Sequence, residues 1–127
     1  MVKKLYLVAF LIFIVDRFFK ILFTDYSFSI FSYSLNTGAA FGILKNWNFF
    51  LTIFGILAII IILYYRNEKK LEIGMGLLLG GVISNTLDRI LYNGVVDYVH
   101  FAWNIFNLAD VSNIIGAAIL IYYSWEN

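Results

Sequence analysis

Two carboxylates, Asp97 and Asp110, lie where one apolar segment of the chain ends and the next begins, and other polar residues are close to them in the sequence. These neighbours are Asn85, Asp88, Arg89 and Asn107. A charged side chain at the centre of a membrane helix costs about 2.5–3.5 kcal/mol, so such residues usually face the interior of a bundle and have a function. Two adjacent carboxylates share one proton, because both cannot ionise cheaply. Such a pair can supply the general base and the general acid of a hydrolysis.

The composition indicates an integral membrane protein. Of the 127 residues, 62% are hydrophobic, 20% aromatic and only 13% charged, and the mean hydropathy is +0.86. A soluble domain of this size needs more charged residues to cover its surface. The length allows a single domain, residues 1–127, with several membrane spans. The carboxylate pair then suggests an aspartic peptidase that works on a membrane substrate.

The residue counts exclude several other kinds of chemistry. The chain has no Cys, which removes thiol catalysis, disulfides and Cys-based metal sites. Its single His, His100, cannot form a histidine metal cluster, and a Ser–His–Asp triad would need that His without a GxSxG motif to accompany it. The net charge of +1, without a basic patch, argues against a nucleic-acid partner. We expect no metal or cofactor, and a monomer.

Four apolar segments are long enough to cross a membrane as helices, which takes about 20 residues each. They lie at about 5–23, 47–65, 72–91 and 107–124. We therefore expect an all-α four-transmembrane-helix bundle. The basic residues on one side of this bundle are Lys3, Lys4, Arg66, Lys69 and Lys70. Only Lys45 falls on the other side, and this asymmetry predicts cytoplasmic termini and an outward-facing Asp97 loop.

The outer loops contain a predicted strand and a predicted lid. Residues 29–35 alternate small polar and apolar side chains, which is the pattern of a half-buried strand. Gly38 and Gly42 bracket a turn that leads back toward the membrane. Together these features predict a small extracytoplasmic β-sheet. Residues 98–106 are short, aromatic and amphipathic, which suits an interfacial helix or a short lid.

The third apolar segment combines a packing motif with polar residues. Residues 76–80 have GxxxG spacing, which is typical of closely packed membrane helices. Gly81, Asn85 and Arg89 continue at helical spacing, so this face becomes polar toward the outer end. We assign the neighbouring Asp88 to positioning Arg89 and the helix end. The alternative is an ordinary interfacial ion pair between Asp88 and Arg89.

The remaining polar residues have structural alternatives. Asp16 and Lys20 lie four apart in the first segment and can pair on one helix face, and Lys20 is also a candidate for substrate contact. Asn107 and Asp110 could serve as the N-cap and a first-turn residue of the fourth helix. For Asp97 the alternative is a solvated loop position.

These motifs resemble those of the bacterial lipoprotein signal peptidase family, signal peptidase II. The matching residues, in order, are Asp16, Lys20, Asn36–Phe41, Gly80–Gly81, Asn85, Asp88–Arg89, Gly94, Val96–Tyr98, Phe106–Asn107 and Ala109–Asp110. The resemblance implies that Asp97 and Asp110 form a catalytic dyad. It also implies an enzyme of the bacterial cytoplasmic membrane that cleaves prolipoproteins N-terminal to a diacylglyceryl-modified cysteine.

The resemblance further implies a set of binding residues and partners. In an enzyme of this family, a pocket would form hydrogen bonds with the prolipoprotein or with the antibiotic globomycin. Membrane lipids would surround the protein. The residues assigned to this pocket are Asn36, Asn85, Arg89 and Asn107, to which we add Lys20 and Gly38. Asp16 and Asp88 are expected to be structural. Three features depart from the family pattern: Ser84 replaces a usual Gly, Ile105 replaces a frequent Pro, and the interval between the two aspartates is short, which predicts a reduced lid.

A second function from another class fits the same carboxylates, namely a small membrane transporter or proton relay. A relay needs titratable groups distributed across the membrane. Here the titratable groups within the apolar segments, apart from Asp16, crowd toward the predicted outer face. A purely structural membrane subunit would leave the polar clusters unexplained. The sequence therefore favours chemistry at the membrane surface.

Overall fold

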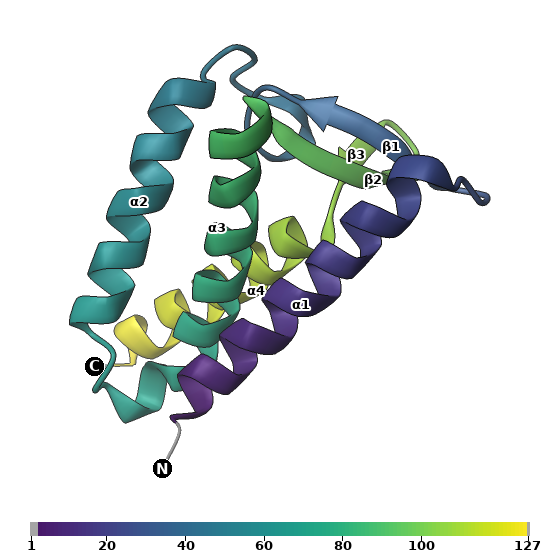
Figure 1. The fold of residues 1–127 in the computed structure, drawn as a ribbon. Coiled ribbons are helices and arrows are strands. Elements are labelled where there is room, and N and C mark those ends of the chain that lie inside the picture. The colour runs from purple at the N-terminus through teal and green to yellow at the C-terminus, as the bar shows by residue number, and fades with distance from the viewer. Residues whose placement is uncertain (1–2, 127) are drawn as a thin grey trace.

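The computed structural model describes residues 3–126, apart from the side chain of Phe41. The helices within this range are α1 (Lys4–Asp25), α2 (Asn48–Tyr64), α3 (Glu72–Tyr92) and α4 (Leu108–Trp125), with short 3-10 turns at Ala40–Gly42 and Lys69–Leu71. The strands are β1 (Phe31–Asn36), β2 (Val95–Phe101) and β3 (Asn104–Phe106). They form a small sheet at one end of the helix bundle (Figure 1). The helices confirm the predicted helical segments to within two residues at each end.

The helix α3 lies at the centre of the bundle and packs against α1, α2 and α4, whereas α2 and α4 hardly contact each other. Glycines let the neighbouring backbones approach α3 closely. A Cβ atom on Gly76 would lie 2.8 Å from the carbonyl oxygen of Leu5 in α1, and one on Gly81 would lie 2.6 Å from that of Ala109 in α4. The predicted packing role of the glycine-rich face is thereby confirmed.

The sheet is antiparallel, with strand order β1-β2-β3. Strand β1 begins two residues later than predicted and ends one residue later. Of the two alternatives for residues 98–106, the interfacial helix is wrong, because this segment forms most of β2, a turn at Ala102–Trp103, and β3. The short lid stays a prediction. The β-branched and aromatic residues of the segment fit a pleated surface, and pairing with β1 satisfies the backbone groups of β2.

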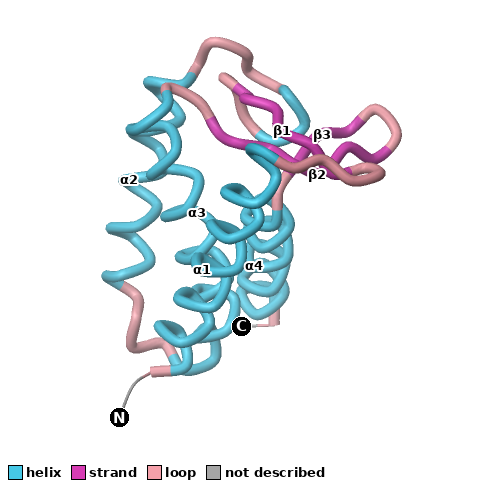
Figure 2. Tube along the Cα trace, turned by 45° about the vertical axis from the view of Figure 1, so that its right-hand side comes forward, coloured by secondary structure: helices cyan, strands magenta, loops and turns pink. Residues whose placement is uncertain are grey.

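Both chain termini lie at the end of the bundle opposite the sheet (Figures 1 and 2). The ammonium group of Lys3 donates hydrogen bonds to the carbonyl of Arg66 and to the side chain of Asn67. The N-terminal segment and the connection from α2 to α3 therefore meet at this end. The basic residues that the sequence analysis placed on one side are gathered here.

The two ends of the bundle differ in what they bury. Near the termini the core is apolar, with Leu5, Ala9, Ile62, Met75 and Leu79 in one cluster. Toward the sheet the buried side chains become polar. The most deeply buried of these are Asp16, Lys20, Ser84, Asp88, Asp97 and Asn107. The fold thus holds a polar interior directly beneath the sheet.

The close approach of α1 and α3 gives a first prediction. A Cβ atom on Gly80 would meet the carbonyl oxygen of Ala9 at 2.5 Å, so we expect Gly80→Val to destabilise the bundle by about 2 kcal/mol through overpacking. Thermal unfolding in detergent measures this loss. Ile90→Val, at an exposed position of the same helix, is the control and should leave the midpoint nearly unchanged. Equal midpoints for the two variants would contradict the packing role of Gly80.

Candidate active site

The start of α4 fixes the first carboxylate of the pair. Asn107 is the N-cap residue, and its side chain accepts a hydrogen bond of 2.8 Å from the backbone N–H of Asp110. In return, Oδ2 of Asp110 accepts one of 3.1 Å from the backbone N–H of Asn107, which completes a capping box. The alternative capping role is therefore real for both residues. It leaves Oδ1 of Asp110 to accept from the amide of Asn85 at 2.9 Å.

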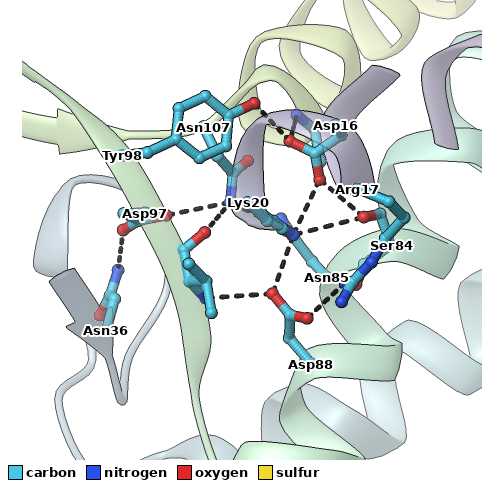
Figure 3. A network of polar contacts seen from close by, with 12 residues as sticks. Asp16, Arg17, Lys20, Asn36, Ser84, Asn85, Asp88, Asp97, Tyr98 and Asn107 are labelled. Atoms are coloured by element: carbon cyan, nitrogen blue, oxygen red, sulfur yellow. Dashed lines mark hydrogen bonds and ion pairs between the residues drawn. The ribbon is translucent and has the colours of Figure 1, made fainter. Parts of the chain in front are cut away.

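The second carboxylate, Asp97, lies on β2 and is only 1% exposed. Its Oδ1 accepts a hydrogen bond of 3.0 Å from the side-chain amide of Asn107, and its Oδ2 accepts one of 3.2 Å from Asn36 (Figure 3). Because Asn107 contacts both Asp97 and Asp110, the structure brings the predicted pair together. The solvated-loop alternative for Asp97 is wrong.

The proximity of the two carboxylates appears in the titration of Asp97. Burial, and next the neighbouring charge of Asp110, raise the pKa of Asp97 from 3.8 to about 8, and the hydrogen bond from Asn36 offsets only part of this rise. At neutral pH the carboxyl group of Asp97 therefore holds a proton. Such a raised pKa next to a second carboxylate is typical of acid–base sites.

The amides around the pair have one orientation that satisfies their partners. The side-chain oxygen of Asn107 faces a backbone N–H, which can only donate, so its NH₂ group must face Asp97 and Asn85. The oxygen of Asn85 likewise faces the ammonium group of Lys20 at 3.0 Å, which turns its NH₂ group toward Asp110. Both amides are thereby held as donors to the carboxylate pair.

A buried network of charges supports this arrangement. The ammonium group of Lys20 lies 2.8 Å from Asp16 and 2.9 Å from Asp88, and Arg17 also pairs with Asp88 (Figure 3). The predicted pairing of Asp16 with Lys20 is confirmed. Two cations and two carboxylates balance each other, which offsets the cost of removing each charge from water. Lys20 is 2% exposed, and this position favours a structural role over substrate contact.

The structure gives Asp88 partners other than Arg89. Its carboxylate accepts hydrogen bonds from Arg17 and from the backbone N–H of Val96, in addition to its pairing with Lys20. Within residues 3–126 no ion pair joins Asp88 to Arg89. Asp88 therefore ties α3 to α1 and to the start of β2. The i, i+1 neighbours on α3 point in different directions, so adjacency in the sequence was misleading.

Three residues of the network were not singled out as site residues from the sequence: Arg17, Ser84 and Tyr98. The hydroxyl groups of Ser84 and Tyr98 donate to Asp16 at 2.6 Å and 2.7 Å, and Asp16 also accepts from the backbone N–H of Ala109. Burial, and next the charge of Asp16, raise the pKa of Tyr98, which keeps its phenol protonated as a donor. The available signals were the departure from the family pattern at Ser84 and the adjacency of Tyr98 to Asp97.

The loop after β1 completes the site. Asn36 accepts a hydrogen bond of 2.8 Å from the backbone N–H of Gly38 and donates one of 2.6 Å to the carbonyl of Ala39. Arg89 donates to the carbonyl of Gly38 at 3.1 Å through NH2. Its NH1 is buried and has no hydrogen-bond partner in the described part of the chain. Asn36, Gly38 and Arg89 thus lie around the carboxylate pair, where the sequence analysis placed them.

The two carboxylates line different cavities. One cavity of about 440 Å³ is lined by Asp97, Asn36 and Trp103, and the last of these belongs to the turn of the hairpin. The other, of about 180 Å³, is lined by Asp110, Asn85 and Arg89. No group of three or more His, Cys, Asp or Glu side chains suited to a metal ion occurs among the described residues. Each carboxylate therefore lines a cavity, and the pair has the groups that acid–base chemistry needs.

The pKa of Asp97 gives a second prediction. The unfolded chain loses this proton near pH 3.8, whereas the folded protein retains it to about pH 8, so folding binds a proton across this window. The free energy of unfolding should therefore fall as pH rises from about 4 to about 8, by up to about 1.4 kcal/mol per pH unit. Asp97→Asn should lack this contribution.

Unfolding of the wild type and Asp97→Asn in detergent between pH 5 and pH 9 measures the difference. The variant should gain stability relative to the wild type as pH rises and level off above about pH 8. Asp25→Asn, which removes an exposed carboxylate at the end of α1, is the matched control. Parallel pH curves for the wild type and Asp97→Asn would contradict the raised pKa.

The chain is similar to proteins of one known family. The family model of signal peptidase II matches residues 8–126. The lipoprotein signal peptidase of Halothermothrix orenii is 42% identical over 100 residues, which cover 75% of this chain and 69% of that protein. The lipoprotein signal peptidase of Anoxybacillus flavithermus is 34% identical over an alignment of 141 residues, which covers 94% of this chain and 84% of that protein. A solved bacterial membrane enzyme, 26% identical, superposes with a TM-score of 0.83 over 99% of this chain and 93% of that one. A matching family model, close relatives and a shared fold together show that this chain belongs to the signal peptidase II family.

Proposed function

We propose that the protein is an aspartic endopeptidase of the bacterial cytoplasmic membrane that removes signal peptides from prolipoproteins. It cuts on the amino side of a diacylglyceryl-modified cysteine. The observation that carries the proposal is the pair of buried carboxylates, Asp97 and Asp110, held by the same residue, Asn107. The enzyme is proposed to act as a monomer, and a globomycin-type molecule would compete with the substrate for the same cavities.

The chemistry follows from the environments of the two carboxylates. Asp97 holds the shared proton at neutral pH, and Asp110 lies in the first turn of α4, where a helix favours negative charge. Asp110 accepts a proton from a water molecule, whose oxygen attacks the scissile carbonyl carbon. Asp97 donates its proton to the carbonyl oxygen. Collapse of the tetrahedral intermediate breaks the C–N bond, and a proton from the pair passes to the leaving nitrogen.

The surface of the protein supports insertion in a membrane. Large apolar side chains on the outside of α1 and α2 are exposed, among them Phe10, Phe18, Phe49 and Ile60, whereas the interior beneath the sheet buries polar and charged side chains. Helices of 17–22 residues measure about 26–33 Å, close to the thickness of the hydrocarbon core. Among the helices of residues 3–126, only α4 is both long enough and apolar enough to be identified as a membrane span from its length and composition alone. The helix α2 is apolar but shorter. We propose that all four helices span the membrane, with the charges of α1 and α3 turned inward.

The orientation follows from the basic residues. Those predicted to be cytoplasmic gather at the end of the bundle that holds both termini, and the sheet and the carboxylate pair lie toward the other end. We therefore place the termini in the cytoplasm and the site at the outer face of the membrane. The comparisons offer no support for the transporter alternative. The apolar cluster of Leu5, Met75 and Leu79 fills the opposite end of the bundle, where a relay would need titratable groups.

Substitution of the carboxylates tests the proposed mechanism. Asp97→Asn and Asp110→Asn keep the size of the side chain but remove the base or the acid, so each should lower cleavage of a diacylglyceryl-modified prolipoprotein at least about a thousandfold. The double variant should be hardly slower than either single one, because the pair acts as a unit. Asp25→Asn should cleave like the wild type. Substantial cleavage by a correctly inserted Asp97→Asn or Asp110→Asn protein would exclude the aspartic mechanism.

A comparison of substrates tests the role of the lipid. The site lies beside membrane-exposed helix surfaces, so the acyl chains of the substrate can stay in the bilayer while its backbone reaches the carboxylates. Binding energy from such remote groups also orients the reacting bond. The unmodified precursor should therefore show a lower kcat as well as a higher KM than the diacylglyceryl form, measured with purified enzyme in lipid bilayers. Equal rates for both precursors would remove the lipid from the mechanism.

A further inference from the structure

One polar side chain next to the carboxylate pair has no role in the network described above. Asn113 lies on α4, three residues after Asp110, and lines the same cavity of about 180 Å³. Its side-chain oxygen is buried, and no group in the described part of the chain donates a hydrogen bond to it. A buried acceptor without a donor is costly, so such atoms usually await a partner.

The structure makes room for this side chain. A Cβ atom on Gly81 of α3 would collide with the side-chain oxygen of Asn113. The missing side chain of Gly81 therefore allows the carboxamide of Asn113 to lie against α3, next to the cavity that Asn113 lines. This accommodation places the amide at the cavity wall rather than in the lipid-facing surface of α4.

A second unpaired group lies in the same cavity. NH1 of Arg89 is buried and has no acceptor among the described residues, whereas the oxygen of Asn113 has no donor. The cavity thus offers one free donor and one free acceptor beside Asp110. A polypeptide backbone carries the complementary groups, because each peptide unit has one C=O and one N–H.

The position along α4 indicates which part of a substrate would meet Asn113. Three helical residues correspond to about 4.5 Å, and an extended peptide advances about 3.3 Å per residue. Asn113 is therefore displaced from Asp110 by one to two substrate residues. The displacement is toward the interior of the bundle, away from the sheet (Figure 1). The apolar region of a signal peptide precedes its cleavage site, so this is the side on which the signal peptide lies.

We propose that Asn113 is a substrate-binding residue whose side-chain oxygen accepts a hydrogen bond from a backbone N–H of the signal peptide, one or two residues before the scissile bond. The free NH1 of Arg89 binds a carbonyl of the same segment. The cavity is lined by residues of α2, α3 and α4, and α2 and α4 hardly contact each other, so we place the entry of the substrate chain between these two helices. The assignment rests on the proposed function and adds the binding of the signal-peptide backbone to it.

Kinetics of Asn113→Leu test the assignment. Leu has a similar size but cannot accept a hydrogen bond, so KM for a diacylglyceryl-modified prolipoprotein should rise about tenfold while kcat changes less than twofold. The thermal midpoint should stay equal or rise, because the variant removes an unsatisfied buried oxygen. A purely structural role would instead lower the midpoint and leave KM unchanged.

Ser112→Ala is the matched control on the same turn of α4. The hydroxyl group of Ser112 donates to the carbonyl of Leu77 at 2.7 Å, and Ser112 is not part of the cavity lining. This variant should lower the thermal midpoint and leave KM and kcat unchanged. A rise in KM equal to that of Asn113→Leu would show that the effect comes from disturbed helix packing and would overturn the assignment.

Substrate analogues provide a test that does not depend on the stability of a variant. In two analogues, the backbone N–H one or two residues before the scissile bond is replaced by an ester oxygen. For the wild type, kcat/KM should be about tenfold lower with one of these ester analogues than with the amide substrate. For Asn113→Leu, kcat/KM should be the same with that analogue and with the amide substrate. Unchanged rates of the wild type with both analogues, or equal losses in the two enzymes, would overturn the role of Asn113. Failure of the wild type to cleave the lipid-modified precursor at all would instead overturn the proposed function.

Discussion

The ammonium group of Lys20 lies between the carboxylates of Asp16 and Asp88, and the positions of the surrounding elements depend on this contact. Buried carboxylates must be paired or hydrogen-bonded, because each loses its hydration on folding. Lys20 pairs one carboxylate from its own helix with one from α3. It also donates to Asn85, whose amide then faces Asp110. One cation therefore determines both the contact of two helices and the orientation of a donor in the site.

The same network positions the sheet. The backbone N–H of Val96 donates a hydrogen bond to Asp88 on α3, and the backbone carbonyl of Val96 accepts one from Asn107, the N-cap residue of α4. These two hydrogen bonds hold the start of β2. Asp97 follows immediately and has little freedom to move away from Asp110. The glycines of α3 have a related effect, because they keep the helices close enough for these short contacts to form. A site built on such rigid elements needs little rearrangement to reach its reactive geometry.

Much of this arrangement was predictable from the sequence, and the failures have physical reasons. Long apolar runs identify the helices, because few other structures can bury them, and alternation identified β1 to within two residues. The carboxylate pair was predictable because both aspartates lie in the short polar stretch between two apolar segments, within motifs that resemble those of the signal peptidase II family. The structure of residues 98–106 was not predictable, because a short run of aromatic and β-branched residues suits an amphipathic helix and a strand equally. Pairing with β1 selects the strand.

Contacts between helices were the least predictable feature. The pairing of Asp16 with Lys20 follows from their spacing on one helix, whereas that of Arg17 with Asp88 depends on how α1 and α3 are rotated against each other. The same holds for Asn113, whose significance appears only when Gly81 of another helix is seen to make room for it. Spacing within a helix is local information, and rotation between helices is set by the packing of the whole bundle.

The capping box at the start of α4 restricts how this protein can evolve under selection by an inhibitor. Asp110 closes the first turn of a helix and, in the proposed mechanism, faces the reacting bond, and Asn107 caps that helix while it contacts both carboxylates. A replacement that weakens inhibitor binding at either residue also removes part of the helix start. Resistance must therefore arise at residues that line the cavities without supporting the fold, such as those of the loop after β1 and the hairpin turn.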